Sequence, residues 1–186
     1  MTGLNVAIVL IHYPVYDRNH KTVVSAITNL DLHDIARAAR TFGIARYYIV
    51  TPATDQQLLA GKIIGHWQNG YGATYNPKRK AALDLVTVKD TLADAVLDFE
   101  VLSGAPVKLV ATGAAAAATT TYSGFREEIR TSTAAHLLLF GTGWGLADEI
   151  MDAADVILPP LRGPGEYNHL SVRSAASIIL DRLFGQ

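Results

Sequence analysis

Cysteine is absent from the 186-residue sequence, and its absence excludes several kinds of chemistry. Zinc ribbons, iron–sulfur clusters and thiol nucleophiles all depend on cysteine side chains. The six histidines stand at positions 12, 20, 33, 66, 136 and 169, so they form no H-x-x-x-H pair. We therefore expect no metal site.

Long apolar runs and a large net charge are missing too. The apolar run at 6–11 is much shorter than the ~18 residues that a membrane-spanning helix needs. No charged n-region precedes it, so a secretory signal peptide is not predicted. A hydrophobic fraction of 49% and a net charge of −1 are typical of a folded chain. We expect a cytoplasmic globular protein that does not enter a membrane.

The small net charge hides an uneven distribution. Residues 1–93 contain 10 Lys or Arg and 6 Asp or Glu, whereas residues 94–186 contain 6 and 11. A basic face on the first half would suit a polyanion, and an ordinary solvated surface is the alternative. The length suits one domain, and residues 1–186 contain no internal repeat or domain boundary that we can identify.

Apolar runs of strand length alternate with segments of helical periodicity along the whole chain. We expect strands at 4–11, 46–51, 85–88, 107–111, 136–140 and 156–158. Helices are expected at 30–42, 54–68, 77 onward, 91–102, 123–130, 146–152 and 171–184. Because the strands are near-continuous Val/Ile/Leu runs, both of their faces should be covered by helices. This pattern predicts a three-layer α/β domain with a mostly parallel sheet of about six strands.

Polar residues that accept backbone hydrogen bonds mark the starts of several helices. Thr28 and Asn29 are candidate caps for the helix at 30–42. Thr54 opens a T-x-x-Q capping box, and Ser123 is a candidate cap further along. The polar segment 12–21 and the segment around Gly72 are expected to be loops or breaks.

A glycine-rich turn stands where ligands bind in parallel sheets, at the carboxyl end of a strand. Residues 140–146 read F-G-T-G-W-G-L, between the predicted strand at 136–140 and the next helix. Glycines there let the backbone approach a ligand, and a tight turn without a ligand is the alternative. A nicotinamide-binding site would need its glycines early in the fold and an acidic residue after the next strand. Neither condition is met, so an oxidoreductase is a weaker alternative.

Three separated segments together resemble the motifs of SPOUT methyltransferases. Residues 28–43 read T-N-L-D-L-H-D-I-A-R-A-A-R-T-F-G and resemble the first motif, a helix with a key Arg and a closing Phe-Gly. The turn at 140–146 resembles the second motif, F-G-x-E-x-x-G-L. Residues 157–160 (I-L-P-P) and 167–172 (Y-N-H-L-S-V) resemble the third. With H-Y-P-V-Y at 12–16, the sequence is similar to a bacterial family of SAM-dependent RNA methyltransferases, sometimes fused to a tRNA guanine-N1-methyltransferase.

The resemblance implies an α/β fold with a C-terminal trefoil knot that binds S-adenosylmethionine. In such folds, loops after the last strands wrap the cofactor, largely through backbone contacts. The residues that match these loops are Thr112, Gly141, Gly143, Trp144, Leu158, Leu161, Tyr167, Asn168, Leu170 and Ser171. SPOUT enzymes are usually homodimers with the active site at the interface, so a homodimer is expected here.

The sequence departs from the family pattern at three positions. Gly143 stands where the second motif has Glu, and His169 replaces the Asn of the third motif. Asp31 stands where enzymes that methylate the ribose 2′-oxygen often have a second Asn. The resemblance therefore leaves both a ribose oxygen and a base nitrogen open as the methylated atom.

Arg37 and Asn29 are the catalytic residues that the resemblance implies. Arg37 matches the Arg of the first motif, where it would stabilise developing charge or bind a phosphate, since an arginine rarely acts as a base. Asn29 would orient the target, or merely cap the helix. Histidines 12, 33 and 169 are candidate general bases, and structural hydrogen bonding is the alternative for each.

Aromatic and basic residues alternate between positions 66 and 80. Trp67 is followed by Tyr71, Tyr75 and the run Lys78-Arg79-Lys80. Rings that stack on bases and cations that bind phosphates are typical of contacts with single-stranded RNA. We expect RNA contacts from Trp67, Lys78, Arg79, Lys80, Arg18 and Lys21, and the alternative is a helix with a packed Trp and solvated lysines.

The function predicted from these features is methylation of tRNA or rRNA with S-adenosylmethionine. A module that binds the cofactor or RNA without catalysis is the main alternative, because the motif-two Glu is missing.

Overall fold

The computed structural model describes residues 5–186 and contains a six-stranded parallel sheet. The strands occur in the order β5-β4-β1-β7-β6-β8, and each neighbouring pair is parallel. Their bounds are Val6–Ile11 (β1), Tyr47–Val50 (β4), Val86–Lys89 (β5), Val107–Ala111 (β6), Ala135–Gly141 (β7) and Val156–Ile157 (β8). The prediction of a parallel sheet of about six strands is thus confirmed.

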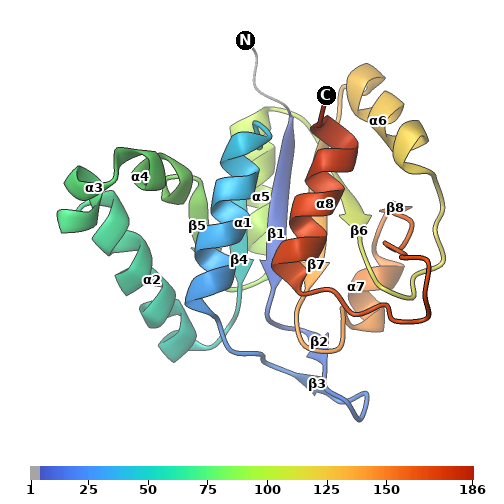
Figure 1. Cartoon of the computed structure of the whole chain (residues 1–186), viewed down its shortest axis with the longest axis horizontal. Helices are drawn as coiled ribbons and strands as arrows, with labels where there is room; N and C mark the ends of the chain where they lie inside the picture. The colour runs from blue at the N-terminus through green and yellow to red at the C-terminus, as the bar shows by residue number, and fades with distance from the viewer. Residues whose placement is uncertain (1–4) are drawn as a thin grey trace.

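Helices cover both faces of this sheet (Figure 1). One face carries α1 (Asn29–Thr41), α2 (Thr54–Gln68), α4 (Pro77–Leu83), α6 (Tyr122–Thr131) and α8 (Val172–Phe184), and the short α3 (Tyr71–Tyr75) packs on α2 and α4. The other face carries α5 (Leu92–Ser103) and α7 (Asp148–Asp152). In Figure 1, α1 and α8 lie side by side in front of the centre of the sheet.

Two hydrophobic cores, one on each face, explain why the strands are apolar throughout. Along β1, Val6, Ile8 and Leu10 pack into the core under α1 and α8, and the residues between them pack into the core under α5. Every β1 side chain is therefore buried. Burying a large aliphatic side chain contributes roughly 2 kcal/mol, so a polar residue at any β1 position would be costly.

The structure confirms one predicted helix cap and corrects two. Thr28 caps α1, because its side chain accepts a hydrogen bond from the backbone N–H of Asp31. Thr54 does not cap α2; the cap is Ala53, which has no capping side chain. The predicted box does not form, because Thr54 is already the first residue of α2, and the Gln57 amide donates instead to the carbonyl of Thr51 and to Asp90. At α6, Thr121 is the cap in place of Ser123.

Two short elements were not predicted from the sequence. A small antiparallel hairpin is formed by β2 (Val15–Tyr16), inside the segment 12–21 that was expected to be a loop, and β3 (Thr22–Val23), directly after that segment. The expected helix break is present at 69–70, but Gly72, which was also expected to break the helix, lies inside α3. The hairpin packs against the glycine-rich turn, where Val15 forms a bridge with Leu146. Its stability thus comes from a contact between distant parts of the chain, which local sequence does not reveal.

The trefoil knot stays a prediction. After the edge strand β8, the chain from 158 to 171 turns back towards the middle of the sheet and enters α8 (Figure 1). Among residues 5–186, no helix combines the length and the hydropathy that crossing a membrane requires.

Candidate functional site

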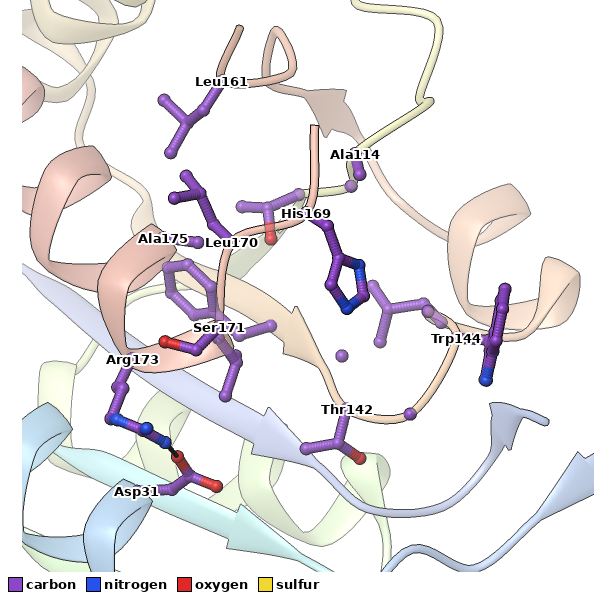
Figure 2. A pocket seen from close by; sticks show the side chains of 18 of the residues that line it. Asp31, Ala114, Thr142, Trp144, Leu161, His169, Leu170, Ser171, Arg173 and Ala175 are labelled. Carbon is purple, nitrogen blue, oxygen red and sulfur yellow. Dashed lines mark hydrogen bonds and ion pairs between the residues drawn. The ribbon is translucent and has the colours of Figure 1, made fainter. Parts of the chain in front are cut away.

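A cavity of about 580 Å³ lies beyond the carboxyl ends of β1, β6 and β7, where a parallel sheet binds its ligands (Figure 2). Its volume falls within the range of about 300–1,000 Å³ that is usual for small-molecule pockets. The walls come from the segments 25–31, 112–115, 140–146 and 159–179. Most of the lining side chains are small or apolar, and the charged ones are Asp31 and Arg173.

The glycine-rich turn forms one wall, and its backbone geometry requires glycine at three positions. Gly145 has a φ of 113°, a conformation that residues with a side chain rarely adopt. At Gly141, a Cβ atom would lie 2.8 Å from the backbone nitrogen of Leu146. Gly143 has a φ of 58°, and a Cβ there would lie 2.8 Å from the carbonyl oxygen of Tyr16 in the β2–β3 hairpin. The close turn and the adjacent hairpin therefore explain these glycines, which also line the cavity.

The segment from 159 to 171 forms the opposite wall. Asn168 donates a hydrogen bond from its side-chain amide to the carbonyl of Ala114, at 3.0 Å, and so joins this wall to the loop after β6. Ser171 ends the segment as the cap of α8, where its hydroxyl accepts a bond from the backbone N–H of Ser174. On the loop after β6, the Thr112 hydroxyl donates to the carbonyl of Leu139 at 2.8 Å.

An ion pair that the sequence analysis missed lies at the edge of the cavity. The Asp31 Oδ1 atom is 3.1 Å from the Nη1 atom of Arg173, and the Thr28 hydroxyl donates to Asp31 Oδ2 at 2.7 Å (Figure 2). The Nε atom of Arg173 is also 3.8 Å from Asp34. Asp31 is only 6% exposed, and a buried carboxylate needs such a partner. The one feature of the sequence that could have revealed this pair is Asp31 itself, an acidic residue at a position where enzymes that methylate the ribose 2′-oxygen often have Asn.

A buried histidine lies behind the cavity. The His12 Nδ1 atom is 2.9 Å from the hydroxyl of Ser25, which lines the cavity and also bonds the Thr142 hydroxyl. Burial lowers the pKa of His12 to about 4, partly offset by the negative charge of Asp31 and the bond to Ser25. His12 is therefore neutral at pH 7. Its Nε2 atom has no hydrogen-bond partner among residues 5–186.

Most of the predicted cofactor residues gather around this one cavity. Eight of the ten line it: Thr112, Gly141, Gly143, Trp144, Leu161, Asn168, Leu170 and Ser171. The other two lie outside its lining. Leu158 follows β8 and is fully buried in the core, whereas Tyr167 is 81% exposed.

The predicted catalytic residues Arg37 and Asn29 do not line the cavity of their own chain. They line a second hollow of about 550 Å³ on α1, α2 and α4, together with Trp67 and Arg79. The Arg79 guanidinium lies 4.5 Å from the centroid of the Trp67 ring. The reason is helical geometry: Thr28 and Asp31 face the cavity, and the residues at 29, 33 and 37 lie on the neighbouring face of α1.

The remaining predicted RNA-binding residues do not join this hollow. Lys78 is exposed on α4, and Lys80 forms an ion pair with Asp84 at 2.8 Å. Arg18 and Lys21 are exposed in the β2–β3 hairpin, which lies well away from α3 and α4 (Figure 1). Within the described part of the chain, no group of three or more His, Cys, Asp or Glu residues is arranged to hold a metal ion.

Comparison with known proteins finds one matching family model and several relatives. Residues 5–185 match the sequence model of a family described as SAM-dependent RNA methyltransferase. The chain is 43% identical over 183 residues to a tRNA (guanine-N(1)-)-methyltransferase of Oleidesulfovibrio alaskensis. The aligned region covers 98% of this chain and 43% of that protein. It is 42% identical over 187 residues to a protein of Aquifex aeolicus described as uncharacterized, and it spans 91% of that protein. The chain thus spans less than half of the first relative and nearly all of the second.

The fold resembles that of a solved methyltransferase with its cofactor. The SpoU methyltransferase AviRb of Streptomyces viridochromogenes, in complex with AdoMet, superposes with a TM-score of 0.61 at 16% identity. The match covers 99% of this chain and 58% of that one. At this level of identity the likeness concerns the fold.

Proposed function

The chain belongs to the family of SAM-dependent RNA methyltransferases, and from that premise we propose that it methylates a tRNA or rRNA nucleotide with S-adenosylmethionine bound in the cavity. The observation that carries the proposal is the gathering of three distant family-like segments around one cavity. The first supplies Thr28 and Asp31, the second the turn at 140–146, and the third the wall that ends at Ser171.

The lining of the cavity fits S-adenosylmethionine. Its apolar part, which includes Leu161, Leu170 and Ile179, suits the flat and uncharged adenine. Backbone groups of the loops and the side chains of Thr112 and Asn168 can fix the polar edges of adenine and ribose. A Cβ atom at Gly145 would meet nothing within 4 Å, so the turn leaves open space for a ligand there. When bound, the cofactor would supply a methyl group on a sulfonium sulfur, and this sulfur would leave as the neutral thioether of S-adenosylhomocysteine when the nucleophile takes the methyl group.

The residues of the chain have to place the RNA nucleophile in line with that methyl group and help it lose a proton. Arg37 and Asn29 are the proposed catalytic residues, although they lie outside the cavity of their own chain. We therefore propose a homodimer in which Arg37 of one copy reaches the cavity of the other. In support, Arg37 is exposed between α1 and α8, beside the exposed apolar side chains of Leu30 and Ile178.

RNA is the proposed substrate, and the second hollow is its proposed contact. Trp67, Arg79 and Lys62 line that hollow with Arg37, and they combine an aromatic ring with three positive charges. Lys78, Lys80, Arg18 and Lys21 stay predicted contacts.

The cytoplasm is the proposed location, since tRNA and rRNA are modified where they are made.

The methylated atom is open between a ribose 2′-oxygen and a base nitrogen. The name of the Oleidesulfovibrio relative specifies guanine N1, but it describes a protein of which this chain spans 43%.

The second candidate function is a module that binds cofactor or RNA without catalysis. It is favoured by Gly143 and His169, which replace the motif-two Glu and the motif-three Asn.

One experiment separates these two candidates. The purified chain is incubated with tritiated S-adenosylmethionine and total tRNA or rRNA that lacks modifications, and label in the RNA is counted. The enzyme predicts label that disappears in Arg37→Ala while cofactor affinity is kept. Cofactor binding with no label in any RNA fraction would favour the non-catalytic module.

A further inference from the structure

An exposed tryptophan stands at the rim of the cavity. Trp144 lines the cavity and yet is 70% exposed, whereas tryptophan side chains are largely buried on average. Figure 2 shows Trp144 at one edge, and the imidazole of His169 projects from the opposite wall into the space between them. An aromatic side chain this exposed beside a cavity is suited to a flat apolar ligand.

The backbone that carries Trp144 is held firmly. Its N–H donates to the carbonyl of Tyr16 at 2.9 Å, and the N–H of Tyr16 donates to the carbonyl of Gly145 at 2.9 Å. The N–H of Gly145 also donates to the carbonyl of Thr142 at 3.0 Å. The hairpin therefore fixes the backbone of the turn that carries Trp144, so a ligand that stacks on the indole need not order the loop.

The opposite side of the rim is also aromatic and apolar. Tyr167 is 81% exposed and packs edge-to-face on His169, with 6.4 Å between the ring centroids. Leu170, next along the chain, is 47% exposed. The charged side chains of the lining, Asp31 and Arg173, are already paired with each other. The mouth of the cavity thus offers π-faces and few free charges, which suits an uncharged aromatic ring.

We propose that this rim, formed by Trp144, Tyr167, His169 and Leu170, holds the target nucleobase of the RNA after it has left its stack. The base stacks on the indole of Trp144 and faces His169, so the nucleotide enters the cavity beside the hydroxyls of Ser25 and Thr142. This inference rests on the proposed RNA methyltransferase function. All four rim residues belong to the second and third family-like segments, which depart from the family pattern at Gly143 and His169, so the rim would set which nucleotide this chain accepts.

A second copy of the chain is the other conceivable occupant of an exposed indole. The observations favour a base, because Trp144 borders the cavity itself. The apolar side chains that suit a second copy, Leu30 and Ile178, lie instead on the outer faces of α1 and α8.

Steady-state kinetics with Trp144→Ala and Trp144→Phe test the proposal. We assign the indole of Trp144 to the base, whereas the family resemblance implies a cofactor contact. Loss of one base–aromatic stack therefore predicts an apparent KM for RNA that rises about 10–100-fold in Trp144→Ala, a much larger change than that in the Kd for S-adenosylmethionine. Trp144→Phe keeps a ring and should stay within a few-fold of the wild type. The control is Val101→Ala, which trims a side chain that is 87% exposed on α5. An unchanged KM in Trp144→Ala would overturn the proposal, and so would a change in sedimentation from dimer to monomer in that variant.

A second measurement needs no known RNA substrate. The chain has two tryptophans, so a nitrogen–proton correlation spectrum contains two indole signals, and Trp144→Phe identifies that of Trp144. We expect this signal to shift when nucleoside monophosphates are added at millimolar concentration to the protein with S-adenosylhomocysteine. If the protein binds S-adenosylhomocysteine but the Trp144 signal shifts with none of AMP, GMP, CMP and UMP, the proposal is also overturned. Failure to bind S-adenosylhomocysteine would instead count against the proposed function.

Discussion

Asp31 on α1 and Arg173 on α8 form an ion pair, with 3.1 Å between Oδ1 and Nη1, although 142 residues separate them. The pair joins the helix of the first family-like motif to the helix that follows the third. Since the wall from 159 to 171 ends directly before Arg173, the pair fixes one side of the cavity relative to the other.

Removing both partners of this pair should destabilise the fold by less than the sum of the two single removals. Arg173→Ala leaves the Asp31 carboxylate buried without its cation, and we expect a loss of about 2 kcal/mol, less than a fully buried pair because Arg173 is partly exposed. The double variant Asp31→Ala/Arg173→Ala should lose less than the sum of the two single variants. Urea unfolding of the four proteins measures this difference, and strictly additive losses would show that the two groups do not interact.

The fold should lose stability on acidification because of His12. Its pKa is about 4 in the folded chain against 6.5 when unfolded, so the unfolded chain binds the proton first as the pH falls. The contribution of neutral His12 to the free energy of unfolding is fully present above pH 6.5. It declines between pH 6.5 and 4, by up to about 1.4 kcal/mol per pH unit. His136, whose pKa is also lowered by burial, adds to the trend.

His12→Asn isolates the contribution of His12 to the pH dependence, because the Asn amide can donate to or accept from the Ser25 hydroxyl and does not titrate. Unfolding free energies measured at several pH values between 4 and 7 should show a shallower slope in the variant. Equal slopes in the variant and the wild type would mean that His12 does not carry this dependence.

Gly143→Ala should weaken both the fold and cofactor binding. Its φ of 58° is unfavourable for alanine by about 1–2 kcal/mol, and the new Cβ would lie 2.8 Å from the Tyr16 carbonyl. Gly163→Ala is the matched control, since a Cβ there meets nothing within 4 Å. Thermal unfolding with and without S-adenosylmethionine should show a lower Tm and a smaller ligand-induced rise for Gly143→Ala only. If Gly143→Ala has the same Tm and the same ligand-induced rise as the control, the conformation of the turn is not needed for stability or for cofactor binding.

Arg37→Ala should abolish most turnover and leave cofactor affinity intact. Arg37 lies outside the cavity of its own chain, and in the proposed dimer it reaches the other copy's cavity to act on the RNA nucleophile, so its loss should affect methyl transfer far more than cofactor binding. Arg130→Ala is a close control: both arginines are exposed and 3.9 Å from an acidic residue three positions earlier on a helix. Mixing Arg37→Ala with a variant that cannot bind the cofactor should restore part of the activity if the active site is shared between two copies. Normal turnover in Arg37→Ala would contradict its catalytic role.

The sheet was predictable from the sequence because the strand signal is local. The six residues of β1 are all apolar, since alternate side chains enter different cores, and only a sheet covered on both faces requires that. The position of the glycine-rich turn at a strand end was predictable for the same reason.

The relations between distant residues were not predictable. No spacing rule names Arg173 as the partner of Asp31, because that contact depends on how α1 and α8 pack. Whether Arg37 enters the cavity depends on the rotation of α1, at about 100° per residue, and a motif alone does not fix that rotation. The β2–β3 hairpin has two-residue strands whose partner is the turn at 143–146, so no periodic pattern could mark it.

Titration calorimetry of the purified chain with S-adenosylmethionine, with S-adenosylhomocysteine and NAD as comparators, measures whether the cavity is a cofactor site. We expect micromolar binding of both sulfur ligands and no binding of NAD. Leu170→Glu, which places a charge in the apolar lining, should weaken the binding of both sulfur ligands, whereas Val101→Ala should not. If neither sulfur ligand binds, with or without added RNA, the cavity is not a cofactor site and the proposed function is contradicted.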